Sequence, residues 1–289
     1  MDKNEPSVCV VMPVYNGAKT IELAIKSLLY QTYTNWNCVI VNDGSTDSTK
    51  MILDKITDNR FIIIHLEKNI GRGGARQIAL QNAMGDYLAF LDADDFYHSE
   101  KIDTQVKAFK YNNDVELVSC GQGSYDEKFE LLTVRGTINQ GKHFYKIGMQ
   151  QKFTCASSMI KIKSATKLNY NTQLNASEDI DFLSRYLDNK QYFVIDSLLY
   201  YYSEFESFSY FKTLEYNYYK LIRIALMFKK EKLKSIEQFS KTIFKTIVYL
   251  IFIPLLGKKF FIKKRGQVPN SKQINEYNLQ LSKLMDNNQ

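Results

Sequence analysis

Short apolar runs alternate with helical patterns over the first 112 residues of the chain. The apolar runs are rich in β-branched and aromatic residues and are long enough only for strands. They cover residues 8–12, 38–41, 61–66 and 87–91. Apolar residues then recur at the three- and four-residue spacing of helices with one buried face, over residues 21–29, 48–58, 75–84 and 99–112. This alternation predicts an α/β fold with a mainly parallel sheet and helices on both faces.

Three further apolar runs and one helical pattern extend the predicted sheet, at residues 115–120, 156–162, 192–196 and 178–189. The length of 289 residues suits one large domain, or one domain with an appendage. We therefore expect a domain over residues 1–215, with halves meeting near residue 112, and a separate helical tail over residues 216–289. The tyrosines at 200–202 are interpreted as core or as a wall of the acceptor site.

Three carboxylates, those of Asp92, Asp94 and Asp95, follow directly after the run at 87–91. Ligands of open α/β sheets bind beyond the carboxyl ends of the strands. Asp92 and Asp94 stand two apart in an extended segment, so both side chains can point the same way. Mg²⁺ or Mn²⁺ held there would keep positions open for phosphate oxygens. The alternative is an acidic turn that caps the next helix.

The ends of the second and third strands also carry groups that suit a nucleotide diphosphate. Asp43 follows the second strand, and Arg76 falls in the first turn of a helix, where the helix dipole favours an anionic partner for this cation. Arg76 could instead be a surface residue. Asp43 could be only a turn residue, with Ser45, Thr46 or Asp47 capping the next helix. Taken together, these strand ends favour a nucleotide-using enzyme over a binding module.

Six motifs, in order over roughly residues 7–190, resemble those of family 2 glycosyltransferases, which have the GT-A fold. They are Val10-Val-Met-Pro-Val-Tyr-Asn16, Gln31-Thr-Tyr33, Val41-Asn-Asp-Gly-Ser-Thr-Asp47, Asn69-Ile-Gly71 with Ala75-Arg76, Gly85-Asp-Tyr-Leu-Ala-Phe-Leu-Asp-Ala-Asp-Asp95 and Ser177-Glu-Asp179. The resemblance implies an inverting transferase that uses a nucleotide-activated sugar, usually UDP-linked, with Mn²⁺ or Mg²⁺. Asn42 and Gln77 depart from the family pattern, where Asp and Asn are usual.

The resemblance also implies how the nucleotide sugar is bound, mainly by the half of the domain at about 1–112, with the acceptor half at about 113–215. Pro13 and Tyr15 would border the base, and Asp43 would accept a hydrogen bond from the uracil N–H. Arg76 would lie near the nucleotide or its diphosphate. Asp92 would contact the sugar side of the nucleotide.

The metal ligand and the general base are implied in the same way. Asp94 would bind the metal that bridges the diphosphate, with Asp95 supporting the site. A sugar hydroxyl that attacks the anomeric carbon must lose its proton, and a nearby carboxylate can accept it. Asp179 is predicted to be this base, with Glu178 in a supporting role. Two acidic residues that merely stabilise a helix N-terminus are the alternative.

Cysteine and histidine usage excludes other classes of site. The four cysteines are scattered without a Cys-x-x-Cys pair, and there are only three histidines. Neither a zinc site nor a disulfide framework is therefore predicted, and the thiols are expected to be buried in a reducing compartment. The N-terminus has no apolar signal region, so we expect a cytoplasmic catalytic part. Processive synthases carry a Gln-x-x-Arg-Trp signature, and this sequence has no segment that resembles it. This absence favours the addition of one sugar per encounter.

The basic charge of the chain is concentrated in the tail. Residues 229–265 contain eleven Lys or Arg against two Glu, a net charge of +9, whereas the whole chain carries +7. Within this segment, Thr246–Gly257 is uncharged but shorter than the roughly 20 residues that span a bilayer. This pattern favours shallow insertion into an anionic membrane surface over nucleic-acid binding, which interleaves aromatic residues among the basic ones. A helix pair packed on the domain is the alternative.

The predicted function is a metal-dependent inverting glycosyltransferase of cell-surface polysaccharide biosynthesis. It would act on a glycan or lipid-linked acceptor at the inner face of the cell membrane. A sugar-phosphate nucleotidyltransferase is the alternative enzyme, but a Gly-rich basic loop is then expected directly after the first strand, and Pro13–Gly17 has no basic residue. An inactive sugar-nucleotide-binding or scaffold protein is the other alternative, against which intact Asp94 and Asp179 argue.

Overall fold

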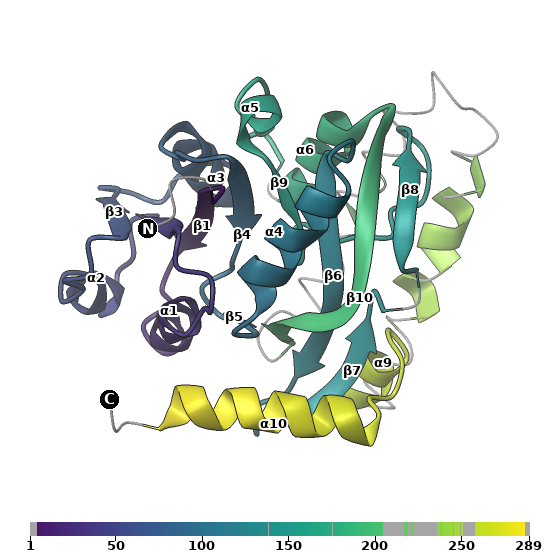
Figure 1. The fold of residues 1–289 in the computed structure, drawn as a ribbon. Coiled ribbons are helices and arrows are strands. Elements are labelled where there is room, and N and C mark those ends of the chain that lie inside the picture. The colour runs from purple at the N-terminus through teal and green to yellow at the C-terminus, as the bar shows by residue number, and fades with distance from the viewer. Residues whose placement is uncertain are drawn as a thin grey trace.

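The computed structural model describes residues 5–137, 139–174, 176–204 and 258–286, with single positions between them at 217, 218, 221, 236, 237, 239–244, 246–248 and 250. A central sheet with the strand order β3-β2-β1-β4-β9-β6-β10-β5 runs through the molecule (Figure 1). Two more strands join its second half, because β7 pairs with β6 and β8 pairs with β10.

The first half of the sheet is parallel, as the sequence predicts. Its strands are β1 (Val8–Val14), β2 (Trp36–Asn42), β3 (Phe61–His65) and β4 (Tyr87–Phe90). The helices that follow them are α1 (Ile21–Leu29), α2 (Thr49–Leu53), α3 (Arg72–Gln81) and, after the short β5, α4 (Lys101–Tyr111). Val8 of the central strand pairs with Trp36 on one side and with Tyr87 on the other. The carboxyl ends of these strands therefore lie at one edge.

The second half makes the sheet mixed. It contains β5 (Phe96–Tyr97), β6 (Leu117–Tyr125), β7 (Leu131–Arg135), β8 (Gly141–Tyr145), β9 (Met159–Lys161) and β10 (Lys190–Ser203), with the helices α5 (Ile162–Ala165) and α6 (Glu178–Leu187). β6 and β10 are parallel, whereas β9 is antiparallel to both β4 and β6. The connection from β6 to β7 is short, and a short connection joins only antiparallel strands.

Helices cover both faces of the sheet. Alternate residues of β1 belong to two different hydrophobic clusters, as the two-residue period of a strand requires. Val8 and Val10 pack in the cluster that contains residues of α1 and α4, and Cys9 and Val11 pack in the cluster that contains residues of α3 and α6. All four cysteines are buried and have free thiols, as predicted. This arrangement confirms the predicted α/β class.

The end of the chain packs against this domain. The last two helices are α9 (Lys258–Lys263) and α10 (Ser271–Met285). α10 runs across one end of the molecule beside α1 (Figure 1). Tyr277 of α10 is fully buried against Phe96, Tyr125 and Tyr201, and its hydroxyl donates to the Phe129 carbonyl at 3.0 Å. The boundary at residue 216 remains a prediction, but α10 contributes side chains to the core.

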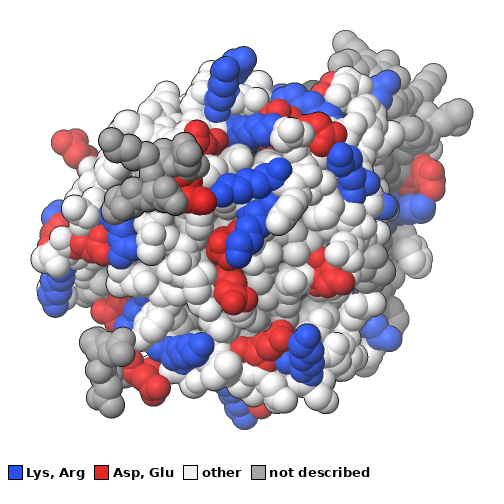
Figure 2. Space-filling model, viewed as in Figure 1, with Lys and Arg blue, Asp and Glu red and all other residues white. Residues whose placement is uncertain are grey.

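Part of the basic tail lies outside the described residues. Most of Thr246–Gly257 lies outside the described residues. None of the helices in the described parts of the chain is long and apolar enough to cross a membrane. Basic and acidic side chains are interspersed over the face shown in Figure 2. On α4, for example, Lys107 pairs with Asp103 and Lys110 pairs with Glu5, both at 2.7 Å.

Candidate active site

The predicted nucleotide-binding residues lie at the carboxyl edge of the parallel strands. Pro13 is half-buried near the end of β1, and Tyr15 just beyond it is 50% exposed. Asp43 follows β2 and is almost fully buried. Its N–H donates to the Val14 carbonyl, and its Oδ1 accepts from the Ile70 N–H, both at 2.8 Å. Asp43 thus connects the end of β1 with the segments that follow β2 and β3, and one of its carboxylate oxygens is already bonded to the protein.

The loops after β1 and β2 are joined by side-chain hydrogen bonds. Asn16 has a positive φ of 53°, and its Oδ1 accepts from the Thr46 N–H at 2.8 Å. The Asn16 N–H in turn donates to Ser45 Oγ at 2.9 Å. Of the three candidate helix caps, Asp47 accepts from the Thr49 N–H in the first turn of α2 at 3.0 Å. Ser45 instead binds the neighbouring loop.

An ion triad centred on the buried Arg76 connects the strand ends to α6. Arg76 is 5% exposed, and its guanidinium donates to Asp92 Oδ1 at 2.8 Å and to Glu178 Oε1 at 2.7 Å. Burial acts to raise the pKa of the Asp92 carboxyl, but Arg76 and then Arg72 outweigh burial, so this pKa is lowered. The triad brings together residues from α3, from the segment after β4 and from α6. The contact of Arg76 and Asp92 with the nucleotide remains a prediction.

The first turn of α6 carries the predicted base. Glu178 is 1% exposed, and its Oε2 is buried without a hydrogen-bond partner. Burial raises the pKa of the Glu178 carboxyl, although Arg76 acts in the opposite direction. Asp179 is half-buried, and its Oδ1 accepts from the Ile180 N–H at 2.8 Å. Ser177 before them has a φ of 65°, a left-handed conformation that is uncommon for a residue with a side chain. Asp179 therefore lies directly beside the ion triad.

The three carboxylates after β4 have different environments. Asp95 is buried, and its two oxygens accept from the Tyr200 hydroxyl at 2.5 Å and from the Ser203 N–H at 2.9 Å. Burial, followed by the nearby Asp94 and Asp92 carboxylates, raises the pKa of Asp95 well above its usual value. The Asp94 carbonyl accepts from the Tyr125 hydroxyl at 2.9 Å, and the Asp94 side chain is half-exposed. Asp92 and Asp94 are thus both partly exposed, whereas Asp95 is buried.

The carboxylates after β4 suit a divalent cation whose remaining ligands would come from a substrate. Among the described residues, no group of three or more His, Cys, Asp or Glu side chains is placed to hold a metal ion. Mg²⁺, however, is usually bound through one or two carboxylates together with substrate phosphates. After burial, the neighbouring Asp94 and Asp92 carboxylates are the next causes that raise the pKa of Asp95, so like charges lie close together at this edge. A cation at Asp94 would relieve that repulsion, and carboxylate oxygens are the donors that it prefers.

Two tyrosines contact the aspartates after β4: Tyr125 is absent from the sequence-based assignment, and Tyr200 is assigned there only to the core or to a wall of the acceptor site. Tyr200 on β10 donates to Asp95, and Tyr125 at the end of β6 donates to the Asp94 carbonyl. The predicted last strand ends at residue 196, whereas β10 continues to Ser203. The position of both tyrosines near carboxyl ends of parallel strands was the signal that could have identified them.

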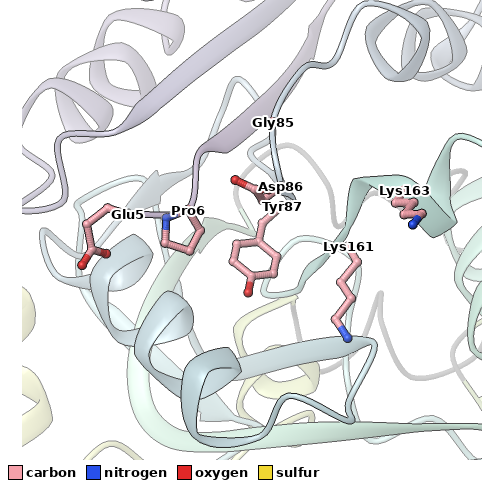
Figure 3. Close-up of a pocket in the computed structure, with 7 residues that line it drawn as sticks. All are labelled: Glu5, Pro6, Gly85, Asp86, Tyr87, Lys161 and Lys163. Atoms are coloured by element: carbon pink, nitrogen blue, oxygen red, sulfur yellow. The ribbon is translucent and has the colours of Figure 1, made fainter. Parts of the chain in front are cut away.

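A surface hollow of about 470 Å³ lies elsewhere (Figure 3). It is lined by Glu5, Pro6, Gly85, Asp86, Tyr87, Lys161 and Lys163. Tyr87 begins β4, whereas Asp92 follows the end of that strand. The hollow is therefore at the opposite edge of the sheet from the candidate active site.

Comparison with known proteins defines the class. The family model described as "Glycosyl transferase family 2" matches residues 9–163. An uncharacterized glycosyltransferase of Methanocaldococcus jannaschii, MJ1057, is 31% identical over 274 residues, which cover 91% of this chain and 93% of that protein. The chain belongs to glycosyltransferase family 2.

Two further relatives add detail. The Escherichia coli UDP-Glc:alpha-D-GlcNAc-diphosphoundecaprenol beta-1,3-glucosyltransferase WfgD is 36% identical over 119 residues, which cover 41% of this chain and 46% of WfgD. The first curated relatives are matched over less than half of their length, from 18% to 46%. The mannosyltransferase PcManGT from Pyrobaculum calidifontis, solved with GDP-Man and Mn²⁺, superposes with a TM-score of 0.63 at 13% identity, covering 99% of this chain and 89% of that one. This similarity confirms the predicted GT-A-like fold.

Proposed function

We propose that this glycosyltransferase is an inverting enzyme that moves a sugar, a hexose or an N-acetylhexosamine, from a UDP-linked donor to a hydroxyl group of a glycan or lipid-linked acceptor. The observation that carries the proposal is the Asp92–Arg76–Glu178 triad. This triad supports the proposal because it links Asp92 to the start of α6, where the candidate base Asp179 follows Glu178. The name of WfgD, which specifies a UDP-linked glucose donor and a lipid diphosphate acceptor, supports the same substrate classes.

One set of residues binds the nucleotide diphosphate that leaves, and Asp179 acts on the hydroxyl group that attacks. Pro13, Tyr15 and Asp43 hold the base of the nucleotide, and the second oxygen of Asp43 accepts from its ring N–H. Asp94 would hold Mn²⁺ or Mg²⁺, which neutralises charge on the departing diphosphate. Asp179 accepts the proton of the attacking hydroxyl, on the other flank of the sugar, as inversion by a single displacement requires.

Replacing Asp94 with Asn tests the metal assignment. We expect Asp94→Asn to remove Mn²⁺-dependent turnover of a UDP-sugar while the protein still unfolds cooperatively, because the lost carboxylate is half-exposed. Turnover is measured against Mn²⁺ concentration, and unfolding is followed by circular dichroism. The control is Asp86→Asn, which changes the same charge at the opposite edge of the sheet. Near-normal activity of Asp94→Asn at saturating Mn²⁺ would contradict the assignment.

We also propose that the enzyme works on cell-surface polysaccharide at the inner face of the membrane, through its basic tail. Ile236, Phe239, Ile243, Phe244 and Ile247 are between 38% and 70% exposed. Their spacing places them on one stripe of a helix, the pattern of a surface that inserts shallowly. The net charge of +9 over residues 229–265 adds attraction to anionic headgroups.

Sedimentation with vesicles that contain phosphatidylglycerol tests this surface. The full chain is expected to bind at low salt and to be partly released as salt rises, because salt screens only the charge attraction. Phe239→Ser with Phe244→Ser should weaken binding by about tenfold or more, since two apolar anchors are lost. Met51→Ser with Met84→Ser removes exposed apolar side chains elsewhere and serves as the control. A full chain that ignores vesicles at low salt would overturn the membrane proposal.

A further inference from the structure

Lys101, on the α4 side of the sheet, is a buried cation that the proposed chemistry does not use. It is 0% exposed, and burial lowers its pKa to about 8. Within the described part of the chain its ammonium has no carboxylate partner. It donates to Gln105 Oε1 at 2.7 Å and lies 4.1 Å from the centre of the Tyr97 ring. Burying a charge is costly unless neighbouring groups stabilise it, so the groups that contact the Lys101 ammonium are important for its position.

The ammonium orients the amide of Gln105. A lysine has only donors, so Gln105 must turn its oxygen toward Lys101. The Gln105 Nε2 group then donates to the carbonyls of Val118 and Ser157, each at 2.9 Å. Val118 is on β6, and Ser157 lies in the segment before β9. Lys101 thereby fixes the position of this segment through Gln105.

The segment 153–158 leads from this buried contact to the candidate active site. Because Met159 pairs with both Ala89 and Val118, the residues before it run between the end of β4 and β6. Ser157 Oγ hydrogen-bonds to Thr154 Oγ1 at 2.8 Å. Thr154 Oγ1 donates to Gln122 Oε1 on β6 at 2.7 Å. One chain of hydrogen bonds therefore connects Lys101 to Gln122.

This series of hydrogen bonds ends near the Asp92–Arg76–Glu178 triad. Burial raises the pKa of the Cys155 thiol, next to Thr154. The next largest influences on this pKa come from Arg76, which lowers it, and from Asp179 and Asp92, which raise it, so the thiol lies near the triad. Gln122 pairs across the strands with Tyr200, whose hydroxyl binds Asp95.

Gln122, at the end of this hydrogen-bond network, has a donor group that is not used. It is 7% exposed, and in the described part of the structure its Nε2 group makes no hydrogen bond. Its oxygen is already committed to Thr154. The Nε2 group is not among the fully buried side-chain atoms of the described residues that lack a partner, so it keeps access to solvent and can donate to an acceptor oxygen of a bound ligand.

We propose that Gln122 donates through its Nε2 group to a hydroxyl or acetamido oxygen of the sugar that is transferred, and that Thr154, Lys101 and Gln105 are positioning residues for this contact. The inference rests on the proposed function and specifies its donor selectivity. A site built to hydrogen-bond a substrate group discriminates against analogues that lack or misplace the group. The network therefore determines which nucleotide sugar is used, whereas the residues near Asp43 recognise the nucleotide.

The test compares four donors, UDP-glucose, UDP-galactose and their N-acetylated counterparts, which differ in substituents of the sugar ring. kcat/KM is measured with each donor, and UDP affinity is measured by calorimetry. We expect Gln122→Met to reduce the ratio between the best and the second donor by about tenfold, the effect of one neutral hydrogen bond. UDP affinity should stay within about twofold of the wild type, because the nucleotide contacts are unchanged.

Lys101→Met should reduce the same ratio, although it touches no substrate, because it releases Gln105 and the segment 153–158. The matched control is Lys107→Met on α4, which removes the same charge from a side chain that is 64% exposed. An unchanged ratio in Gln122→Met overturns the inference even if Lys101→Met fails to fold. An unchanged ratio in a folded Lys101→Met overturns the positioning role. A wild-type protein that turns over no nucleotide sugar would instead contradict the proposed function.

Discussion

Asp179→Asn is expected to slow sugar transfer by about 10²–10⁴-fold, the usual loss when a general base is removed. The affinity for UDP and for the nucleotide sugar should change little, because Asp179 accepts the proton and does not hold the nucleotide. Asn keeps the shape of the side chain and an oxygen for the Ile180 N–H. Single-turnover transfer to an acceptor, combined with calorimetric titration of UDP, separates the chemical step from binding.

The same helix provides a matched control for this variant. Asp181 is also in the first turn of α6, but its carboxylate pairs with Arg185 at 2.7 Å. Asp181→Asn makes the same change of charge and should leave the transfer rate within about twofold of the wild type, because surface ion pairs contribute little. A folded Asp179→Asn protein that keeps most of its transfer rate would assign Asp179 to helix stabilisation, worth about 0.3–1 kcal/mol, and would make Glu178 the candidate base.

Arg76→Met is expected to lower the free energy of unfolding by about 3–5 kcal/mol, because removal of one partner leaves buried charge uncompensated. The Glu178 carboxylate is the more affected partner, because it is 1% exposed and would lose its ion pair without gaining contact with water. Urea unfolding followed by circular dichroism measures the change. Arg72→Met replaces an exposed arginine in the first turn of the same helix and should change stability by less than about 1 kcal/mol.

The deficit of Arg76→Met should also depend on pH. Burial already raises the pKa of Glu178 above its ordinary value of 4.5, and Arg76 opposes this rise. Without Arg76 the folded protein binds the Glu178 proton more tightly than the unfolded chain does. Its stability therefore falls relative to the wild type as pH rises above about 4.5, and the difference narrows at lower pH. A pH-independent loss of less than about 1 kcal/mol would show that Asp92 and Glu178 do not depend on Arg76.

The parallel half of the fold and the motif residues of the site were predictable from the sequence. The first four strands are short apolar runs bounded by polar loops, and this pattern is local in the chain. Asp43, Asp92 and Asp94 lie just after such runs. Their placement at one edge follows because parallel strands share the direction of their carboxyl ends. The resemblance to family 2 rests on the same local motifs.

Contacts between distant segments were not predictable in this way. Arg76 and Glu178 are 102 positions apart, and Tyr200 and Asp95 are 105 apart, so no local pattern indicates that they meet. Lys101, at the start of an amphipathic helix, suggests a solvated residue, yet it is fully buried. α10 was assigned to a separate tail, because its apolar stripe does not reveal which surface covers it.

The sequence by itself determined the α/β class, the parallel strands and the chemical groups at their ends, because hydrophobic periodicity and motif chemistry act over a few residues. Tertiary structure alone decided the partners of those groups. It placed Arg76 between two carboxylates, added Tyr125 and Tyr200 to the carboxylates after β4, and buried Tyr277 of α10 in the domain. These outcomes depend on which surfaces exclude water together, and that is a property of the whole packed chain.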